Sequence, residues 1–134
     1  MDVNGSCHCG DVQFEAQIDP KRVGLCHCTD CQIFASAPFR TSALVLGDQF
    51  RLVRGEPATY VKTAQSGNQR NLVFCSRCGT HLYASPASGE STIYSVRVGV
   101  LAQRAALRPV AQLWCQSELP WLSSLPGIRR ISEQ

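Results

Sequence analysis

The sequence lacks long apolar runs and any concentration of charge of one sign. Its longest apolar stretches, such as Ala43–Leu46, are far too short to cross a bilayer, so we expect no membrane partner. No charged and then apolar leader precedes the first cysteine, and we therefore expect a reducing, cytoplasmic location. The net charge is only +3, with no basic stripe interleaved with aromatic residues, so no nucleic-acid partner is expected.

The remaining composition is that of an ordinary globular chain. Of its 134 residues, 44% are apolar and 17% are charged, which is typical of one folded domain and excludes a disordered chain. The sequence shows no linker, low-complexity tract or internal repeat. We therefore expect residues 1–134 to form a single domain.

Period-two alternation of apolar and polar residues dominates the recognisable segments. In the segment 12–16, Val12, Phe14 and Ala16 fall on one face, as a half-buried strand requires. Three further segments, rich in β-branched and aromatic residues, are expected to be strands: Thr59–Lys62, Asn71–Phe74 and Thr92–Val98. Turns are expected at four places: Gly47–Asp48, Gly55–Pro57, Ser66–Asn68 and Ser88–Gly89.

The helical segments expected from the sequence are short. One begins near Thr29, the expected N-cap, and carries Cys31 to Phe34. The C-terminal stretch is too interrupted by proline for a long helix. The fold class is therefore predicted to be mainly β with short helical turns.

Cysteine is the over-represented residue. Seven of the eight cysteines fall in three tight clusters: Cys7/Cys9, Cys26/Cys28/Cys31 and Cys75/Cys78. Dense cysteine in a short chain indicates either a disulfide framework or metal binding. Close clustering suits a metal ion, which gathers several sulfurs around one point, whereas disulfide frameworks more often join cysteines spread singly along the chain. The pattern therefore predicts metal binding.

The pair Cys75 and Cys78 has the spacing of a zinc-knuckle half-site. The two intervening residues let both sulfurs reach one metal, and Gly79 permits the tight backbone that follows. Cys7 and Cys9, also followed by glycine, supply a matching pair. Together the two pairs predict a closed four-thiolate zinc site that ties the two parts of the chain together. The alternative is that either pair is free thiol or a disulfide.

The third cluster offers three thiolates, those of Cys26, Cys28 and Cys31, without a partner cluster. Three protein ligands and one vacant position are typical of a reactive zinc site, in which water or substrate takes the fourth place. Because thiolate-bound zinc is soft, a small thiol is the natural occupant. We therefore expect chemistry at this second metal, with water or His27 as proton donor or acceptor.

The alternative is a second closed site, with Cys115, His27 or His81 as the fourth ligand. Cys115 follows an apolar, strand-like segment and is expected to lie in the core. The ring of His27, between two of the cysteines, is expected to point away from the metal. His81 is expected to hydrogen-bond within the turn after the knuckle. The open site is the favoured interpretation.

These motifs resemble those of the glutathione-dependent formaldehyde-activating (GFA) family. The resemblance is carried by three ordered motifs and extends over about residues 5–121: Gly5–Phe14, Cys26–Gln32 and Phe74–Leu82. It implies a β-tent fold of several coiled antiparallel β-sheets, built as a single domain around a structural zinc. It also implies two zinc ions per chain.

The family pattern implies which cysteines bind each zinc ion and what the protein does. The implied ligands of the structural zinc are Cys7, Cys9, Cys75 and Cys78, and those of the second, open zinc are Cys26, Cys28 and Cys31. The implied activity is that of a carbon–sulfur lyase resembling S-(hydroxymethyl)glutathione synthase, with glutathione as the thiol. Centromere protein V, which the family resembles, implies the alternative of a non-catalytic zinc-binding interaction module.

One position departs from the family pattern. Ile33 stands where the family commonly has a basic residue. Glutathione carries two carboxylates, and Arg40 is the remaining candidate to bind one of them. The alternative for Arg40 is an ordinary surface arginine at the end of a strand.

Overall fold

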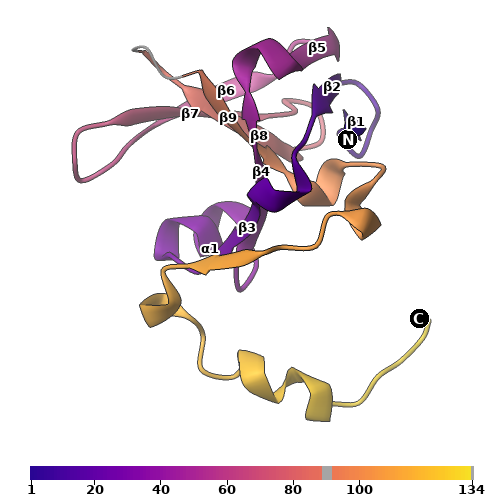
Figure 1. The fold of residues 1–134 in the computed structure, drawn as a ribbon, viewed down its shortest axis with the longest axis vertical. Helices are drawn as coiled ribbons and strands as arrows, with labels where there is room; N and C mark the ends of the chain where they lie inside the picture. The colour runs from indigo at the N-terminus through magenta and orange to yellow at the C-terminus, as the bar shows by residue number, and fades with distance from the viewer. Residues whose placement is uncertain (89–91, 134) are drawn as a thin grey trace.

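The computed structural model describes residues 1–88 and 92–133, which contain two β-sheets joined by short helical segments (Figure 1). The small sheet is antiparallel, with the order β1-β2-β5, and consists of β1 (Asp2–Ser6), β2 (Gln13–Gln17) and β5 (Phe50–Arg54). The large sheet has the order β10-β3-β4-β9-β8-β7-β6. Its strands are β3 (Val23–Cys26), β4 (Arg40–Leu46), β6 (Ala58–Thr63), β7 (Gln69–Phe74), β8 (His81–Pro86), β9 (Ile93–Arg97) and β10 (Ala111–Leu113). Only β10 and β3, among the described strands, are parallel neighbours.

The helical segments are short, as expected. The α-helix α1 spans Thr29–Ala35, and its N-cap is Cys28 rather than the expected Thr29, because the Cys28 sulfur accepts a hydrogen bond from the Cys31 amide. The 3-10 segments are η1 (Pro20–Arg22), η2 (Gly47–Gln49), η3 (Val98–Val100), η4 (Arg104–Ala106), η5 (Cys115–Ser117) and η6 (Leu122–Gly127). The predicted mainly β fold with short helical turns is confirmed. None of the helices in the described residues has the length and apolar character needed to span a membrane.

The expected strands are present with small shifts of their ends. The alternation at 12–16 belongs to β2, and Val12, Phe14 and Ala16 are all buried. The other three expected strands correspond to β6, β7 and β9. In the expected turn Ser88–Gly89, Gly89 lies outside the described residues.

The core lies between the small sheet and one face of the large sheet. Phe14 of β2 is central to it, with its ring centroid 5.2 Å from that of Phe50 and 6.0 Å from that of Tyr83. Gly5 is paired with Phe14 across β1 and β2. A Cβ atom at Gly5 would lie 2.0 Å from the Phe14 ring, so only glycine leaves room for this aromatic side chain.

The large sheet has two chemically different faces. Ala43 and Val96, which are paired across β4 and β9, point into the core. Successive side chains of a strand point to opposite faces, so Arg40 and Ser42 of β4 lie on the other face, where Ser42 is paired with Arg97. This second face, over which α1 lies, carries the second cysteine cluster.

Candidate metal centres

The first cysteine cluster is formed by two tight loops, one after β1 and one after β7. In the first loop the Gly10 amide donates to the Cys7 carbonyl at 3.1 Å, and in the second the Gly79 amide donates to the Cys75 carbonyl at 2.8 Å. Gly10 and Gly79 both have positive φ, of 79° and 73°, which favours glycine over residues with a Cβ. The loops therefore fold back on themselves and direct their sulfurs to one point.

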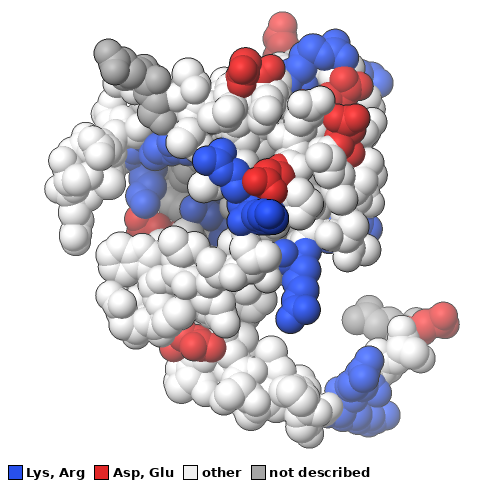
Figure 2. Space-filling model, in the orientation of Figure 1, with Lys and Arg blue, Asp and Glu red and all other residues white. Residues whose placement is uncertain are grey.

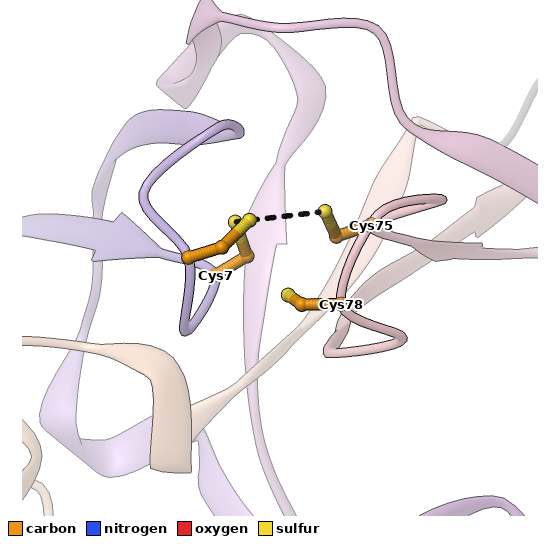
Figure 3. Close-up of side chains that lie close together, drawn as sticks. Cys7, Cys75 and Cys78 are labelled. Carbon is orange, nitrogen blue, oxygen red and sulfur yellow. Dashed lines mark hydrogen bonds between the residues drawn. The ribbon is translucent and has the colours of Figure 1, made fainter.

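The structure brings the four sulfurs of the expected closed site together. Figure 3 shows the side chains of Cys7, Cys75 and Cys78 directed into one space between the two loops. The Cys9 sulfur lies 3.5 Å from that of Cys7 and 3.8 Å from that of Cys75, and all four sulfurs lie within 4.8 Å of one another. Four sulfurs about 2.3 Å from one zinc ion lie roughly 3.8 Å apart, whereas a disulfide needs about 2.05 Å. The spacing fits a tetrahedral metal site and not a disulfide.

The protonation of these thiols also fits a cation. The Thr80 hydroxyl, which lies 3.2 Å from the Cys78 sulfur, is the largest cause that lowers the pKa of Cys78, to about 5. The Asp11 amide lowers the pKa of Cys9, but burial and the three neighbouring sulfurs outweigh it and raise that pKa to about 12. Four thiolates at these distances repel one another, and a divalent cation removes the repulsion.

The second cluster is assembled at the junction of β3 and α1. Cys26 ends β3, Cys28 caps α1 and Cys31 lies in its first turn. The three sulfurs lie within 4.8 Å of one another, and the Cys31 amide donates to the Cys28 sulfur at 3.4 Å. Cys31 is buried and the other two are half-buried. The cluster is therefore partly accessible to solvent.

No fourth Cys, His or carboxylate among the described residues joins this group at that spacing. The expectation that Cys115 lies in the core is wrong, because Cys115 is exposed. Trp114 adopts a left-handed conformation, with φ 57° and ψ 44°, between β10 and η5. β10 lies at the edge of the large sheet and its three residues are exposed, as is Trp114, so the apolar segment before Cys115 does not enter the core.

His27 is held away from solvent rather than presented to a substrate. Only 1% of its surface is exposed, and its Nε2 lies 2.8 Å from Oε1 of Gln112. Its Nδ1 is buried and has no hydrogen-bond partner among the described residues. The Gln32 amide donates to the His27 carbonyl at 2.7 Å and fixes the loop between the cysteines. These contacts give His27 a structural position.

Arg40 lies beside the second cluster. It is paired with Cys26 across β3 and β4 and is half-buried. Burial raises the pKa of Cys28, but the Cys31 amide, the sulfurs of Cys31 and Cys26, and the positive charge of Arg40 together hold it below its ordinary value. Burial also raises the pKa of Cys31, to about 12, and Arg40 opposes that rise. Arg40 therefore favours thiolate at this cluster.

His81, which the sequence suggested only as an alternative metal ligand or a hydrogen-bonding residue of the turn after the knuckle, lies at the start of a strand and is a functional candidate. It begins β8 and is paired with Phe74, and a bulge between Val73 and Phe74 shifts the register. Because of the bulge, His81 lies on the opposite face from Tyr83, which is buried in the core. The His81 ring stacks on Phe74, with centroids 5.7 Å apart, and lies 6.2 Å from the ring of Phe34 in α1.

The environment of His81 keeps its imidazole neutral. Burial is the largest cause that lowers the pKa of His81 below its ordinary value of 6.5, and the charges of Arg97 and Arg40 lower it further. A neutral imidazole is able to accept a proton at pH 7. His81 thus combines a neutral ring with a place on the face that carries the second cluster.

The described residues thus form a protein of two β-sheets that carries two groups of converging cysteine sulfurs. Each group could hold a metal ion. The chain belongs to the glutathione-dependent formaldehyde-activating enzyme (GFA) family, whose model matches residues 2–117. A crystal structure of a Rhodobacter sphaeroides protein has a similar fold, with a TM-score of 0.63 over 81% of this chain and 98% of that chain, at 23% sequence identity. No curated protein matches this sequence.

Proposed function

We propose that the chain binds two zinc ions, a structural one at Cys7, Cys9, Cys75 and Cys78 and a second one at Cys26, Cys28 and Cys31. Converging sulfurs, without carboxylate or imidazole ligands, are the donors that zinc accepts readily. The first set closes a tetrahedral shell with protein ligands alone. The second set leaves one position for a ligand from solution.

We further propose that this second centre binds a small thiol such as glutathione and acts as a carbon–sulfur lyase like S-(hydroxymethyl)glutathione synthase. The observation that carries the proposal is the trio of sulfurs, which has no fourth ligand among the described residues and lies beside Arg40. Membership of the GFA family supports the same assignment. A cytoplasmic location, where thiols stay reduced, fits this chemistry.

The reaction joins the sulfur of a thiol to the carbonyl carbon of an aldehyde. The S–H proton leaves the thiol, the new C–S bond forms, and the carbonyl oxygen takes up a proton to become the hydroxyl; the reverse reaction breaks the same bonds. Zinc, when bound, supplies a Lewis acid that lowers the pKa of a coordinated thiol. Arg40 would bind a carboxylate of the thiol, and the neutral ring of His81 would exchange the proton.

Metal analysis of gently purified protein tests the first part of the proposal. We expect two zinc ions per chain, of which chelators remove the one at the trio first, because three protein ligands hold a metal less tightly than four. The matched variants are Cys28→Ser, which should lower the content to one ion, and Cys115→Ser, which should leave two. A content of one ion in the wild type would remove the basis for the open site.

Titration of cobalt-substituted protein with glutathione tests the thiol site. Cobalt reports its ligands by its absorption spectrum, and we expect a change that saturates with glutathione and is absent in Cys28→Ser. S-methylglutathione, which has no thiol, is the control and should leave the spectrum unchanged. A spectrum indifferent to every small thiol would instead support a non-catalytic zinc-binding module.

A further inference from the structure

Three arginines lie on the same face of the large sheet as the second cysteine cluster. Arg40 is paired with Cys26, and Arg97 is paired with Ser42 on the adjacent pair of strands. Arg70 in β7 lies on this face too. It is two residues from Leu72, and Leu72 pairs with Ala84, which in turn pairs with Ser95. Ser95 is two residues from Arg97 on β9, so all of these side chains share one face. Figure 2 shows Lys and Arg side chains gathered around a hollowed part of the face in view.

Arg97 is buried, and no carboxylate of the described residues forms an ion pair with it. Only 7% of its surface is exposed. Its Nη1 donates to the hydroxyl of Ser42 at 3.0 Å and to the carbonyl and hydroxyl of Ser95 at 3.2 and 3.3 Å. All of these acceptors are neutral, and Nη2 and Nε donate to no described residue. A buried guanidinium without a carboxylate beside it is costly, so a positive charge kept here favours anions nearby, such as the thiolates of the second cluster and an acidic group on a bound ligand.

Arg70 is held in a similar way. Its side chain reaches across β8, and its Nη2 donates to the carbonyl of Ala84 at 3.5 Å and to that of Ile93 at 3.3 Å. The ion pairs of the described residues are elsewhere, between Arg51 and Glu15 and between Lys62 and Asp30. Asp30, the acidic residue of α1 nearest this face, is therefore already neutralised.

The three guanidinium groups are close enough to act on one another. Burial and then the charge of Arg40 lower the pKa of Arg70. Burial, Arg40 and Arg70 lower the pKa of Arg97 to about 9, against the opposing effect of Cys31. Like charges at short range raise the free energy of the folded chain unless an anion lies among them.

A bound metal does not remove the excess of positive charge. Three thiolates and one divalent cation sum to a single negative charge, whereas the three arginines carry three positive charges. A thiolate ligand adds one more negative charge and still leaves one positive charge in excess. One carboxylate on the same ligand balances it.

We propose that Arg70 and Arg97, together with Arg40, form an oxyanion-binding patch that makes the second centre selective for thiols carrying a carboxylate. The proposal rests on the thiol site proposed above and adds the residues that choose among thiols. Guanidinium groups suit this task because they present several N–H donors to a carboxylate in a fixed plane.

Space for such a ligand is available next to the cluster. A cavity of about 480 Å³ is lined by Cys26 and Arg40 and by Ser42 and Ser95, the hydrogen-bond partners of Arg97. Leu44 contributes an apolar wall. A thiol bound beside Cys26 would therefore have Arg40 and the two serine partners of Arg97 along the same cavity.

The test compares three thiols of similar size on cobalt-substituted protein: 3-mercaptopropionate, 2-mercaptoethanol and cysteamine. We expect 3-mercaptopropionate to bind tightest and cysteamine weakest. Arg70→Gln and Arg97→Gln should each weaken 3-mercaptopropionate by roughly ten- to hundredfold and leave 2-mercaptoethanol unchanged. Arg51→Gln removes the same charge from the small sheet and is the matched control. Because Arg97 is buried, a melting curve accompanies each variant, and Arg70→Gln carries the test if Arg97→Gln does not fold.

A second experiment separates this proposal from the thiol site. Succinate, which has carboxylates but no thiol, is added to zinc-loaded protein, and the NMR signals of the arginine Nε–H groups are followed. Equal affinity for all three thiols, or an equal loss for all of them in Arg70→Gln, would overturn the arginine patch while leaving the thiol site intact. If no thiol changed the cobalt spectrum but succinate shifted the arginine signals in the wild type and not in Arg70→Gln, the thiol site would be overturned and the patch would stand. Thiols and succinate both without effect would overturn both.

Discussion

Cys26 and Arg40 are paired across β3 and β4, so a sulfur of the open cluster and a guanidinium group share one face of the sheet. The pairing is antiparallel, and the register continues to Ser42 and Arg97 on the next strand. A rigid sheet thus fixes the distance between a thiol-binding point and a cationic surface. Sites built on strands hold such relationships better than sites built on loops.

We predict that the two clusters differ in their effect on stability. Cys75→Ser removes a fully buried sulfur from the four-cysteine cluster. Structural zinc contributes about 10 kcal/mol or more to folding, which is comparable with the whole stability of a domain. We therefore expect Cys75→Ser to unfold or aggregate, as judged by circular dichroism and gel filtration.

Cys28→Ser should keep the fold, because a serine also caps a helix and costs α1 at most about 1 kcal/mol. Its melting temperature should fall by roughly 4 °C or less. Cys115→Ser, at an exposed position, is the control for loss of a thiol and should melt like the wild type. Equal damage from Cys75→Ser and Cys28→Ser would mean that the second cluster is structural as well.

The cysteine clusters could be found from the sequence because their spacing is local. A knuckle such as Cys75–Gly79 is defined by neighbouring residues, and so is the alternation that predicted β2. Arg70 and Arg97 could not be found in this way, since their meeting depends on the register across β7, β8 and β9. His81 needed a bulge to reach the same face. The prediction for Cys115 failed because the apolar segment before it forms β10, an edge strand whose three residues are all exposed, and a local apolar pattern does not show which strand lies at an edge.

We predict that Gly5→Ala destabilises the protein because its Cβ would enter the space of the Phe14 ring. The nearest approach of 2.0 Å requires a shift of a fully buried aromatic side chain. Overpacking of this kind costs about 1–3 kcal/mol in the free energy of unfolding. Gly99→Ala is the matched control, because a Cβ there meets nothing within 4 Å. Urea denaturation of both variants measures the difference, and equal midpoints would contradict the packing of β1 on β2.

The lowered pKa of His81 predicts a pH-dependent stability. Burial, Arg97 and Arg40 all disfavour the charged ring in the folded state, so the unfolded chain binds the proton more readily. The stabilising contribution is fully present above the ordinary pKa of 6.5 and is lost as pH falls through the lowered value. His81→Phe keeps an aromatic ring beside Phe74 and Phe34 but does not titrate.

The wild type should therefore lose stability relative to His81→Phe when pH is lowered from about 8 to about 5.5. Melting temperatures of both proteins at the two pH values give the comparison, and metal loss at low pH affects both alike. Parallel changes in the two proteins would show that His81 is not held in its neutral form. The same variant should slow thiol addition to an aldehyde without weakening thiol binding to the cobalt protein.

The chain beyond Ser117 should be dispensable for folding. None of the described residues 118–133 is buried, whereas the segment before them is tied to the second cluster. Gln112 lies within 2.8 Å of His27, and the Gln32 amide donates to the Ser117 carbonyl at 3.0 Å. A chain ending at Ser117 keeps both contacts, and its melting temperature should stay within about 2 °C of the full chain.

A chain ending at Val110 loses β10 and leaves the buried His27 ring without Gln112, so it should bind less metal at the trio and melt much lower. If the cut after Ser117 proved as damaging as the cut after Val110, the C-terminal residues would have to pack against another surface, and gel filtration at several concentrations would show whether that surface belongs to a second copy.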